Sequence, residues 1–202
     1  MKWLSFLIGL LGLFTYCDVY GHEEGQAQAR TVTEPIVSNW AVKKTKSTLT
    51  FSGVQSGEAF TGSFSDFDAV IYFDPDSLEN AEVVVTIDMN SASTGDVEST
   101  DALPGKEWFN VRKFPVAQFK ATDFTHLEND KYEAKGNLSI KDVTQSIHLP
   151  FTLNIENGYA SMDAGLNLNR PAYKIGTGMW ASKYWVEHSI AVNVHLEAVQ
   201  IK

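Results

Sequence analysis

The chain has 202 residues, of which 44% are apolar and 20% charged, which is typical of one folded domain and excludes a disordered chain. It carries 16 Lys and Arg against 25 Asp and Glu, so its formal net charge is -9. A protein that binds nucleic acid or an anionic membrane through its charge needs the opposite balance, because attraction to phosphate supplies most of that affinity. We therefore expect no nucleic-acid partner.

The first 21 residues have the layout of a signal peptide. Lys2 gives a positive start, an apolar run follows from Trp3 to Phe14, and the chain turns more polar before Gly21. The run is too short to anchor the chain across a bilayer. We expect residues 1–21 to be removed on export. Cleavage after Gly21 fits the apolar run, and a later cut after Ala29 is the alternative.

The single cysteine lies inside this segment. Cys17 follows Tyr16, where a lipoprotein signal has a small residue, so we do not expect it to carry a lipid. Removal of the segment leaves a domain with no disulfide and no thiolate ligand for a metal. Residues 22–38 are polar, contain Pro35 and show no periodicity, which predicts a flexible linker before a folded domain over residues 39–202.

Apolar and polar residues alternate through most of the chain after Trp40, which predicts strands rather than helices. Asn157-Gly158 separates two alternating runs and is a strong signal for a two-residue hairpin, since that turn requires positive φ at both central positions. The clearest runs are Leu49–Gly53, Val83–Ile87, Tyr132–Ile140, Ile147–Ile155, Ala160–Leu168 and Ile190–Ala198.

Residues 91–114 interrupt this alternation. They contain Gly95 and Pro104, and residues 96–103 within them predict a short helix. The remaining pattern gives eight or nine antiparallel strands, which pack as a sandwich or close into a barrel. Closure removes exposed strand edges, and a barrel of eight strands is about the size that holds one small ligand.

Several segments resemble, in order, the YceI family of periplasmic lipocalin-like barrels, over about residues 39–199. The resemblance implies an all-β fold: an extended antiparallel eight-stranded lipocalin-like β-barrel with a short helix and loop excursion. It also implies a location in the periplasm of a Gram-negative bacterium, and an apolar interior that binds an isoprenoid lipid, either a polyprenyl diphosphate or an isoprenoid quinone. The segments are Trp40–Phe51 (WAVKKTKSTLTF), Phe60–Asp74, Asp76–Thr94, Asp101-Ala102-Leu103, Trp108–Phe119 with Phe114-Pro115, Gly136–Thr144, Leu149-Pro150-Phe151 and Asn169-Arg170.

The residues themselves allow two interpretations of the barrel interior. Aromatic residues beside small ones leave a tunnel with aromatic walls, or they interdigitate in a packed core. The resemblance favours the tunnel. The small residues at expected inward positions are Gly53, Ala117, Ala121, Gly136, Ala160 and Ala164. The residues that we expect to line an apolar ligand cavity are Phe51, Phe60, Phe64, Phe73, Phe119, Phe151, Trp108 and Trp180.

An aromatic-rich loop precedes the last expected strand, and Met179–His188 within it carries more aromatics than is typical of the YceI family. We expect Arg170 and Lys174 in this loop to contact a diphosphate or another polar head group. The alternatives are a solvated loop cation, or an arginine that satisfies buried carbonyl groups. Tyr184 and Trp185, with Trp180, form a gate, contact a membrane surface, or pack at the rim.

Catalytic signatures are missing from the sequence. It has no G-x-S-x-G, no Gly-rich phosphate loop and no H-E-x-x-H, and its five histidines are scattered. An enzyme acting on a barrel-bound lipid would need convergent titratable groups. We therefore expect no catalysis, no metal and no cofactor other than the bound lipid.

Two functions remain. The first is a periplasmic carrier or reservoir for an isoprenoid lipid or quinone. The second is a non-catalytic accessory subunit of a membrane redox protein, because the chain resembles family members that accompany a cytochrome b561-like protein. The second predicts a packed barrel and an exposed apolar patch around Trp180–Trp185. The sequence leaves the oligomeric state open, a homodimer included.

Overall fold

The computed structural model describes residues 39–201, so the predicted signal peptide (1–21) and linker (22–38) lie outside the described residues. The described part holds eleven strands, one α-helix and five short 3-10 helices. The strands are β1 (Trp40–Val42), β2 (Thr48–Gln55), β3 (Glu58–Phe64), β4 (Phe67–Tyr72), β5 (Glu82–Asp88), β6 (Ala92–Ser93), β7 (Val116–Glu128), β8 (Lys131–Ile140), β9 (Val143–Glu156), β10 (Tyr159–Asn169) and β11 (Ser189–Gln200). The helices are η1 (Lys44–Lys46), η2 (Leu78–Asn80), η3 (Met89–Ser91), α1 (Val97–Ala102), η4 (Arg170–Tyr173) and η5 (Gly178–Ala181).

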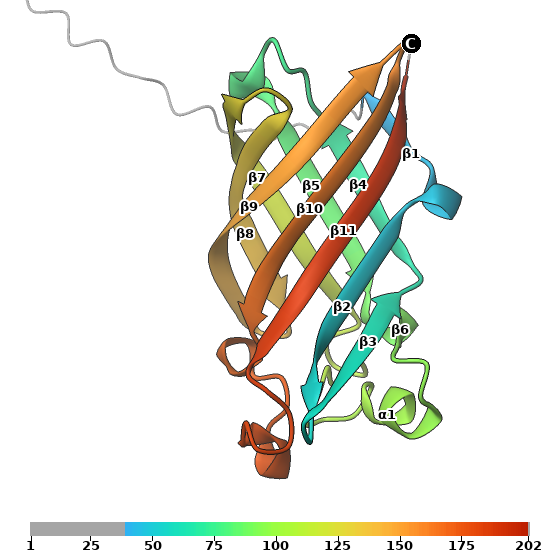
Figure 1. The fold of residues 1–202 in the computed structure, drawn as a ribbon, viewed down its shortest axis with the longest axis vertical. Helices are drawn as coiled ribbons and strands as arrows, with labels where there is room; N and C mark the ends of the chain where they lie inside the picture. The colour runs from blue at the N-terminus through green and yellow to red at the C-terminus, as the bar shows by residue number, and fades with distance from the viewer. Residues whose placement is uncertain (1–38, 202) are drawn as a thin grey trace, which may run out of the picture. The chain divides into compact units, whose positions relative to one another are not determined.

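Eight strands close into a barrel in the order β1-β4-β5-β7-β8-β9-β10-β11, and β11 pairs back to β1 (Figure 1). Every pairing between these strands is antiparallel. This confirms the predicted all-β fold and the closed eight-stranded antiparallel barrel. The strands β2, β3 and β6 extend the wall from β11 beyond the ring.

Strand β11 changes its partner part-way along its length. It pairs with β1 through Ala198–Gln200 and with β2 through Ala191–His195. Ser47 holds this junction, because its hydroxyl accepts a hydrogen bond from the Glu197 backbone N–H at 3.0 Å and donates to the Lys43 carbonyl at 3.0 Å. The short helix η1 thus lets one side of the barrel bend without leaving the β11 backbone unpaired.

The predicted alternation places apolar side chains inside the barrel. Along β9 every second residue, from Ile147 to Ile155, is half-buried and apolar, and the residues between them are exposed. The hairpin between β9 and β10 has φ of 52° at Asn157 and 78° at Gly158, as its sequence predicts. The inner side chains of β9 are only half-buried because they face open space inside the barrel.

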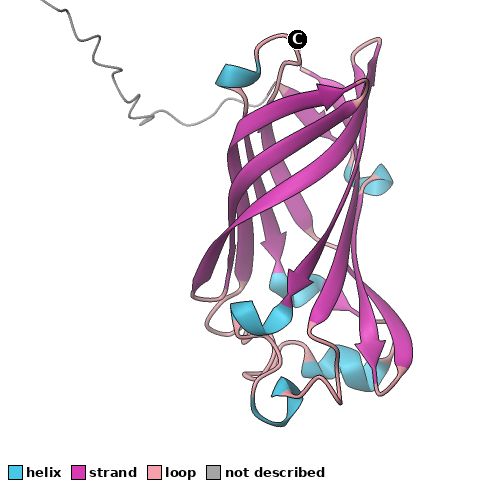
Figure 2. Ribbon diagram, turned by 60° about the vertical axis from the view of Figure 1, so that its left-hand side comes forward, coloured by secondary structure: helices cyan, strands magenta, loops and turns pink. Residues whose placement is uncertain are grey.

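One end of the barrel is covered by irregular segments, residues 94–114 and 170–188, and we call it the loop end (Figure 2). The first segment contains α1, which confirms the short helix expected over residues 96–103. The Asp96 carboxylate caps α1 by accepting a hydrogen bond from the Ser99 backbone N–H at 2.8 Å. The two segments are joined where the Thr177 backbone N–H donates to the Glu107 carbonyl at 2.9 Å.

Strands β9 and β10 separate from each other toward the loop end of the barrel. Pairing between β9 and β10 runs only from Glu156↔Tyr159 to Phe151↔Ala164, whereas β10 pairs with β11 over its whole length. The first half of β9 therefore pairs with β8 on one side, and on the other its Gln145 side chain donates to the Ala172 carbonyl of η4 at 3.0 Å. This parting widens the interior at the loop end. Within residues 39–201, no helix has the length and apolar character needed to cross a bilayer.

Candidate functional site

Two cavities lie inside the barrel. The larger, of about 450 Å³, is at the loop end and we call it the loop-end cavity. The smaller, of about 170 Å³, lies deeper between the strands and we call it the inner cavity. Leu49, Ile87 and Leu138 line both, so the two cavities meet at this level of the barrel.

The inner cavity has a wall of apolar side chains only. Phe73, Phe119 and Phe151 line it, together with aliphatic residues of β4, β5, β9 and β11. The Phe73 ring stands edge-on to that of Phe151, with ring centroids 6.3 Å apart. A wall of this kind binds an apolar ligand by removing apolar surface from water. It offers no hydrogen bond that would select one hydrocarbon chain over another.

The loop-end cavity has aromatic walls and a more polar opening. Phe51 packs against Phe64 at 5.3 Å and against Phe60 at 6.4 Å between ring centroids. Trp108 and Trp180, one from each loop segment, lie 5.7 Å apart on the far side. The polar residues that line this cavity are Gln55, Thr94, Asp96, Glu98, Ser99, Arg170 and Tyr173.

All eight aromatic residues expected to line a ligand cavity do line one of these two cavities. Their role in holding a ligand stays a prediction. The loop-end cavity takes five of them and the inner cavity takes three. The five are Phe51, Phe60, Phe64, Trp108 and Trp180, and the three are Phe73, Phe119 and Phe151.

Close packing against glycine explains how large rings and a cavity coexist. A Cβ atom on Gly62 would overlap the Phe51 ring, and one on Gly136 would lie 2.7 Å from Cε2 of Phe119. These rings therefore pack directly against the glycine backbone, which leaves them closer to the barrel wall than a larger residue would allow. Aromatic rings and small residues therefore interdigitate within the barrel wall, and open space remains inside that wall.

Arg170 has a structural role, which corrects the expectation that it contacts a head group. Its side chain is buried at 2% exposure, and all five of its N–H groups donate to backbone carbonyl oxygens, the alternative that the sequence had left open. No donor is left for a phosphate. The acceptors are Ile175 (3.0 Å), Gly176 (3.1 Å), Trp180 (2.7 Å), Val186 (2.6 Å) and Glu187 (3.0 Å).

Lys174 is placed away from both cavities, so the two cations expected at a head group do not form one site. Lys174 is exposed, its Nζ lies 2.9 Å from Oδ2 of Asp142, and it lines neither cavity. The neighbouring Lys141 donates to the carbonyl oxygens of Trp108 at 3.0 Å and Lys174 at 2.7 Å. Partial burial lowers the pKa of Lys141. Lys141 thus joins the two loop segments, whereas Lys174 forms only an exposed ion pair.

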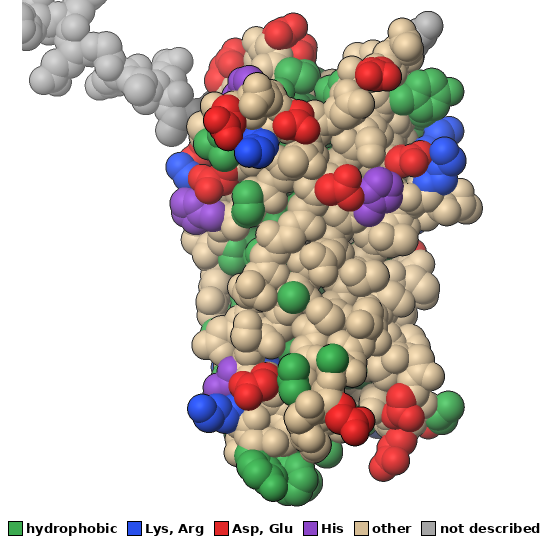
Figure 3. Space-filling model, viewed as in Figure 1, with side chains coloured by type: hydrophobic (Ala, Val, Ile, Leu, Met, Phe, Trp, Pro, Cys, Tyr) green, Lys and Arg blue, Asp and Glu red, His purple; other side chains and the backbone are tan. Residues whose placement is uncertain are grey.

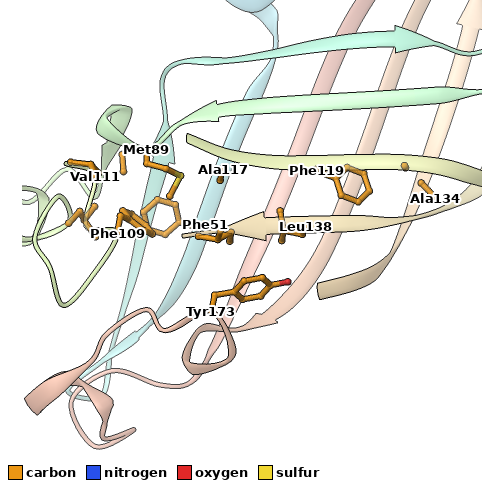
Figure 4. Packing of buried hydrophobic residues seen from close by; sticks show 13 residues of the cluster. Phe51, Met89, Phe109, Val111, Ala117, Phe119, Ala134, Leu138 and Tyr173 are labelled. Carbon is orange, nitrogen blue, oxygen red and sulfur yellow. The ribbon is translucent and has the colours of Figure 1, made fainter. Parts of the chain in front are cut away.

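Tyr173 is the site residue that the sequence did not reveal. It is 2% exposed, it lines the loop-end cavity, and its hydroxyl has no hydrogen-bond partner. Burial raises the pKa of this phenol. Figure 4 shows its hydroxyl directed away from Phe109 and toward the part of the barrel that holds Phe119. Tyr173 lies in a loop without periodicity, so no spacing in the sequence pointed to it.

The outer surface of the loop end exposes apolar side chains (Figure 3). Met179 is 62% exposed, Tyr184 76% and Trp185 42%, whereas Trp180 is turned inward against Trp108. We call these three exposed residues the apolar tip. Part of the aromatic loop therefore lines the cavity and part of it faces solvent.

The titratable residues that line the loop-end cavity are Asp96, Glu98, Arg170 and Tyr173, whereas the described residues that line the inner cavity include none. No three His, Cys, Asp or Glu side chains within residues 39–201 come close enough to hold a metal ion. His148 pairs with Glu133 at 3.2 Å and His195 with Asp163 at 2.8 Å, each on the exposed surface. The site is thus built for contact with apolar groups.

The fold and the two cavities define a closed antiparallel β-barrel with an apolar interior able to hold a ligand. The YceI-like domain matches residues 40–198, and the chain belongs to this family. A UPF0312 protein of Yersinia pestis (strain Pestoides F) is 33% identical over 147 residues, which cover 70% of this chain and 74% of that protein.

Solved structures agree with this assignment. The crystal structure of BcnA from Burkholderia cenocepacia superposes with a TM-score of 0.76 at 28% identity, covering 79% of this chain and 100% of that one. A polyisoprenoid binding domain from Saccharophagus degradans has the same fold, with a TM-score of 0.66 at 14% identity over 81% of this chain and 99% of that one. Both likenesses support the barrel architecture.

Proposed function

We propose that this protein is a non-catalytic periplasmic carrier that holds a polyisoprenoid lipid inside the barrel. The observation that carries the proposal is the pair of meeting cavities, whose walls leave apolar side chains half-exposed in the interior. Half-exposed apolar side chains on an inner face contribute little to stability until an apolar ligand covers them.

The ligand class follows from the shape and chemistry of the walls. A continuous apolar wall accepts a long hydrocarbon chain, and each five-carbon isoprene unit buried there contributes on the order of 3 kcal/mol before ordering costs. Three or four well-covered units are enough for tight binding. The structurally similar domain of Saccharophagus degradans is a polyisoprenoid binding domain, which supports an isoprenoid chain as the ligand of this barrel.

The periplasm is the proposed location because the first 21 residues have the layout of a signal peptide. An isoprenoid lipid that crosses this aqueous compartment needs its apolar chain shielded from water, and a closed barrel provides that shield.

A second function is favoured by the apolar tip. Exposed Met179, Tyr184 and Trp185 suit contact with a membrane or with an apolar surface of a membrane protein. In this alternative the protein is an accessory subunit of a membrane redox protein of the cytochrome b561-like kind. The packed interior that this alternative predicts is absent from the described barrel, because the two cavities occupy it.

Native mass spectrometry of the protein purified from its own periplasm, followed by organic extraction, tests the carrier function. We expect a stoichiometric adduct that extracts as a polyprenyl compound and is recovered chemically unchanged after incubation. A bare mass that stays unchanged after incubation with quinones and polyprenyl phosphates contradicts the carrier and favours the accessory subunit.

A further inference from the structure

The Tyr173 hydroxyl is a buried hydrogen-bonding group that the fold does not use. Its ring already fills its place among Phe109, Leu138 and the other buried apolar residues of the barrel, so packing alone would be served by phenylalanine. The hydroxyl has no partner in the protein and is directed into the barrel (Figure 4). Native structures seldom leave such a group unpaired unless a ligand or water completes it.

The charges around the cavities are unfavourable for an anionic head group. Among the described residues that line the two cavities, Arg170 is the only cation, and its five donors are all taken by carbonyl groups. The acidic residues Asp96 and Glu98 line the same loop-end cavity. The hydrogen bond from the Ser99 backbone N–H lowers the pKa of Asp96, so that this carboxylate keeps its negative charge.

The two cavities differ in polarity in the same way as the tail and the head of a lipid. The inner cavity is apolar throughout and suits a hydrocarbon tail, whereas the polar lining atoms lie in the loop-end cavity. Tyr173 lines the loop-end cavity and belongs to the same buried cluster as Leu138, which lines both cavities. A head group in the loop-end cavity, with its tail beyond Leu138, would share that cavity with the Tyr173 phenol.

We propose that Tyr173 donates a hydrogen bond to the head group of the bound lipid and thereby selects an uncharged, carbonyl-bearing head of the quinone class over a diphosphate. This inference rests on the proposed function, since it concerns the head of the isoprenoid lipid that the barrel carries. A neutral phenol donates one hydrogen bond to a carbonyl oxygen, and it adds no positive charge with which to hold a phosphate.

The test uses three ligands with the same tail: a geranylgeranylated benzoquinone, geranylgeranyl diphosphate and the geranylgeranyl hydrocarbon without a head. Affinities are measured on the delipidated protein by native mass spectrometry and by quenching of tryptophan fluorescence, since Trp108 and Trp180 line the cavity. The variants are Tyr173→Phe, which removes only the hydroxyl, and Tyr184→Phe as the matched control, because Tyr184 is 76% exposed in the same loop.

We expect the wild-type protein to bind the quinone at least about tenfold more tightly than the diphosphate. Tyr173→Phe should weaken quinone binding by about three- to tenfold, the effect of one lost hydrogen bond, and leave hydrocarbon binding unchanged. Tyr184→Phe should change none of the three affinities. The melting temperature of Tyr173→Phe, equal to or above that of the wild type, shows that the variant is folded.

The outcomes separate the two proposals. Equal quinone affinity in the wild type and in Tyr173→Phe overturns the role of the hydroxyl but leaves the carrier intact. Tighter binding of the diphosphate than of the quinone overturns the head-group selection. Failure of all three ligands to bind the wild-type protein overturns the carrier function and this inference with it.

Discussion

The inner cavity and the loop end are built by different means. The inner cavity is walled by strands whose backbones are satisfied by the barrel ladder, so its side chains are free to be uniformly apolar. The loop end is made of irregular backbone, and side chains must satisfy it: Arg170 binds five carbonyl groups and Lys141 binds two. Regular strands thus provide an unselective apolar surface, whereas the loops bring polar atoms to the cavity.

The largest expected effect on lipid binding comes from placing a charge in the inner cavity. Leu153 lines this cavity and is half-buried, and Asn154, the next residue along β9, is exposed on the outside. Leu153→Asp should weaken lipid binding by at least about a hundredfold, because bound lipid would bury an unpaired carboxylate. Asn154→Asp adds the same charge outside and should leave binding unchanged. Lipid content after purification measures both.

These two variants also test the direction of the β9 side chains. The Leu153 side chain is only half-buried in the free protein, so water reaches the new carboxylate and the variant should still fold. Circular dichroism checks this. Full lipid content in a folded Leu153→Asp variant would show that the apolar face of β9 does not hold the ligand.

Loss of the Arg170 side chain should loosen the loop end and spare the strands. Arg170→Met leaves five carbonyl groups without their donors, and we expect it to cost about 3 to 5 kcal/mol of stability. Hydrogen exchange should rise in residues 170–188 and stay low in β8 and β9. Lys174→Met removes an exposed cation of the same loop and should change stability by less than about 0.5 kcal/mol. Equal loss of protection throughout the barrel would mean that the two regions unfold together.

A third variant alters the wall of the loop-end cavity. Gly62→Ala places a methyl group where the Phe51 ring now lies and 2.7 Å from the Ser93 carbonyl oxygen, so both the ring and the backbone of β6 must shift. We expect a loss of about 1 to 3 kcal/mol in urea unfolding, together with reduced lipid capacity. Ala59 lies on the same strand, is exposed and pairs with Val54, so Ala59→Ser serves as a control with little effect. Unchanged stability in Gly62→Ala would show that Phe51 is loosely held.

The strands were predictable from the sequence because one face of each strand lies toward the barrel interior and the other toward water. On β9 this produces the alternation of apolar and polar residues over 147–155. The same alternation placed Phe51, Phe73, Phe119 and Phe151 on apolar strand faces, but it does not extend to Trp108 and Trp180, which lie in the two loop segments. The turn at Asn157-Gly158 was predicted separately, because it requires positive φ at both central positions. The two partners of β11 were not predictable, because both β1 and β2 show the same kind of pattern.

The loop end was less predictable because its organising contacts are made to backbone carbonyl groups. A carbonyl is present at every residue, so no sequence pattern shows that Arg170 would turn inward to bind five of them. Tyr173 was missed for a related reason. Its side chain is directed by η4, a short turn whose orientation depends on the contacts of Arg170 and Gln145.

The smallest expected effect is a pH dependence of stability that arises from Tyr173. The unfolded chain releases the phenol proton near pH 10.0, and burial raises the pKa of Tyr173 in the folded protein, so the folded state binds more protons above that pH. The stability of the wild type should therefore fall as the pH rises past 10 by more than that of Tyr173→Phe.

Urea unfolding of both proteins at about pH 8 and about pH 11 measures this difference. The lowered pKa of Lys141 has the opposite effect on stability, but it is present in both proteins and cancels in the comparison. Tyr184→Phe should behave as the wild type does, because Tyr184 is exposed. Identical pH profiles for the wild type and Tyr173→Phe would mean that water reaches the hydroxyl in the empty barrel. The loop-end cavity would then be hydrated, and a quinone would have to displace that water to reach Tyr173.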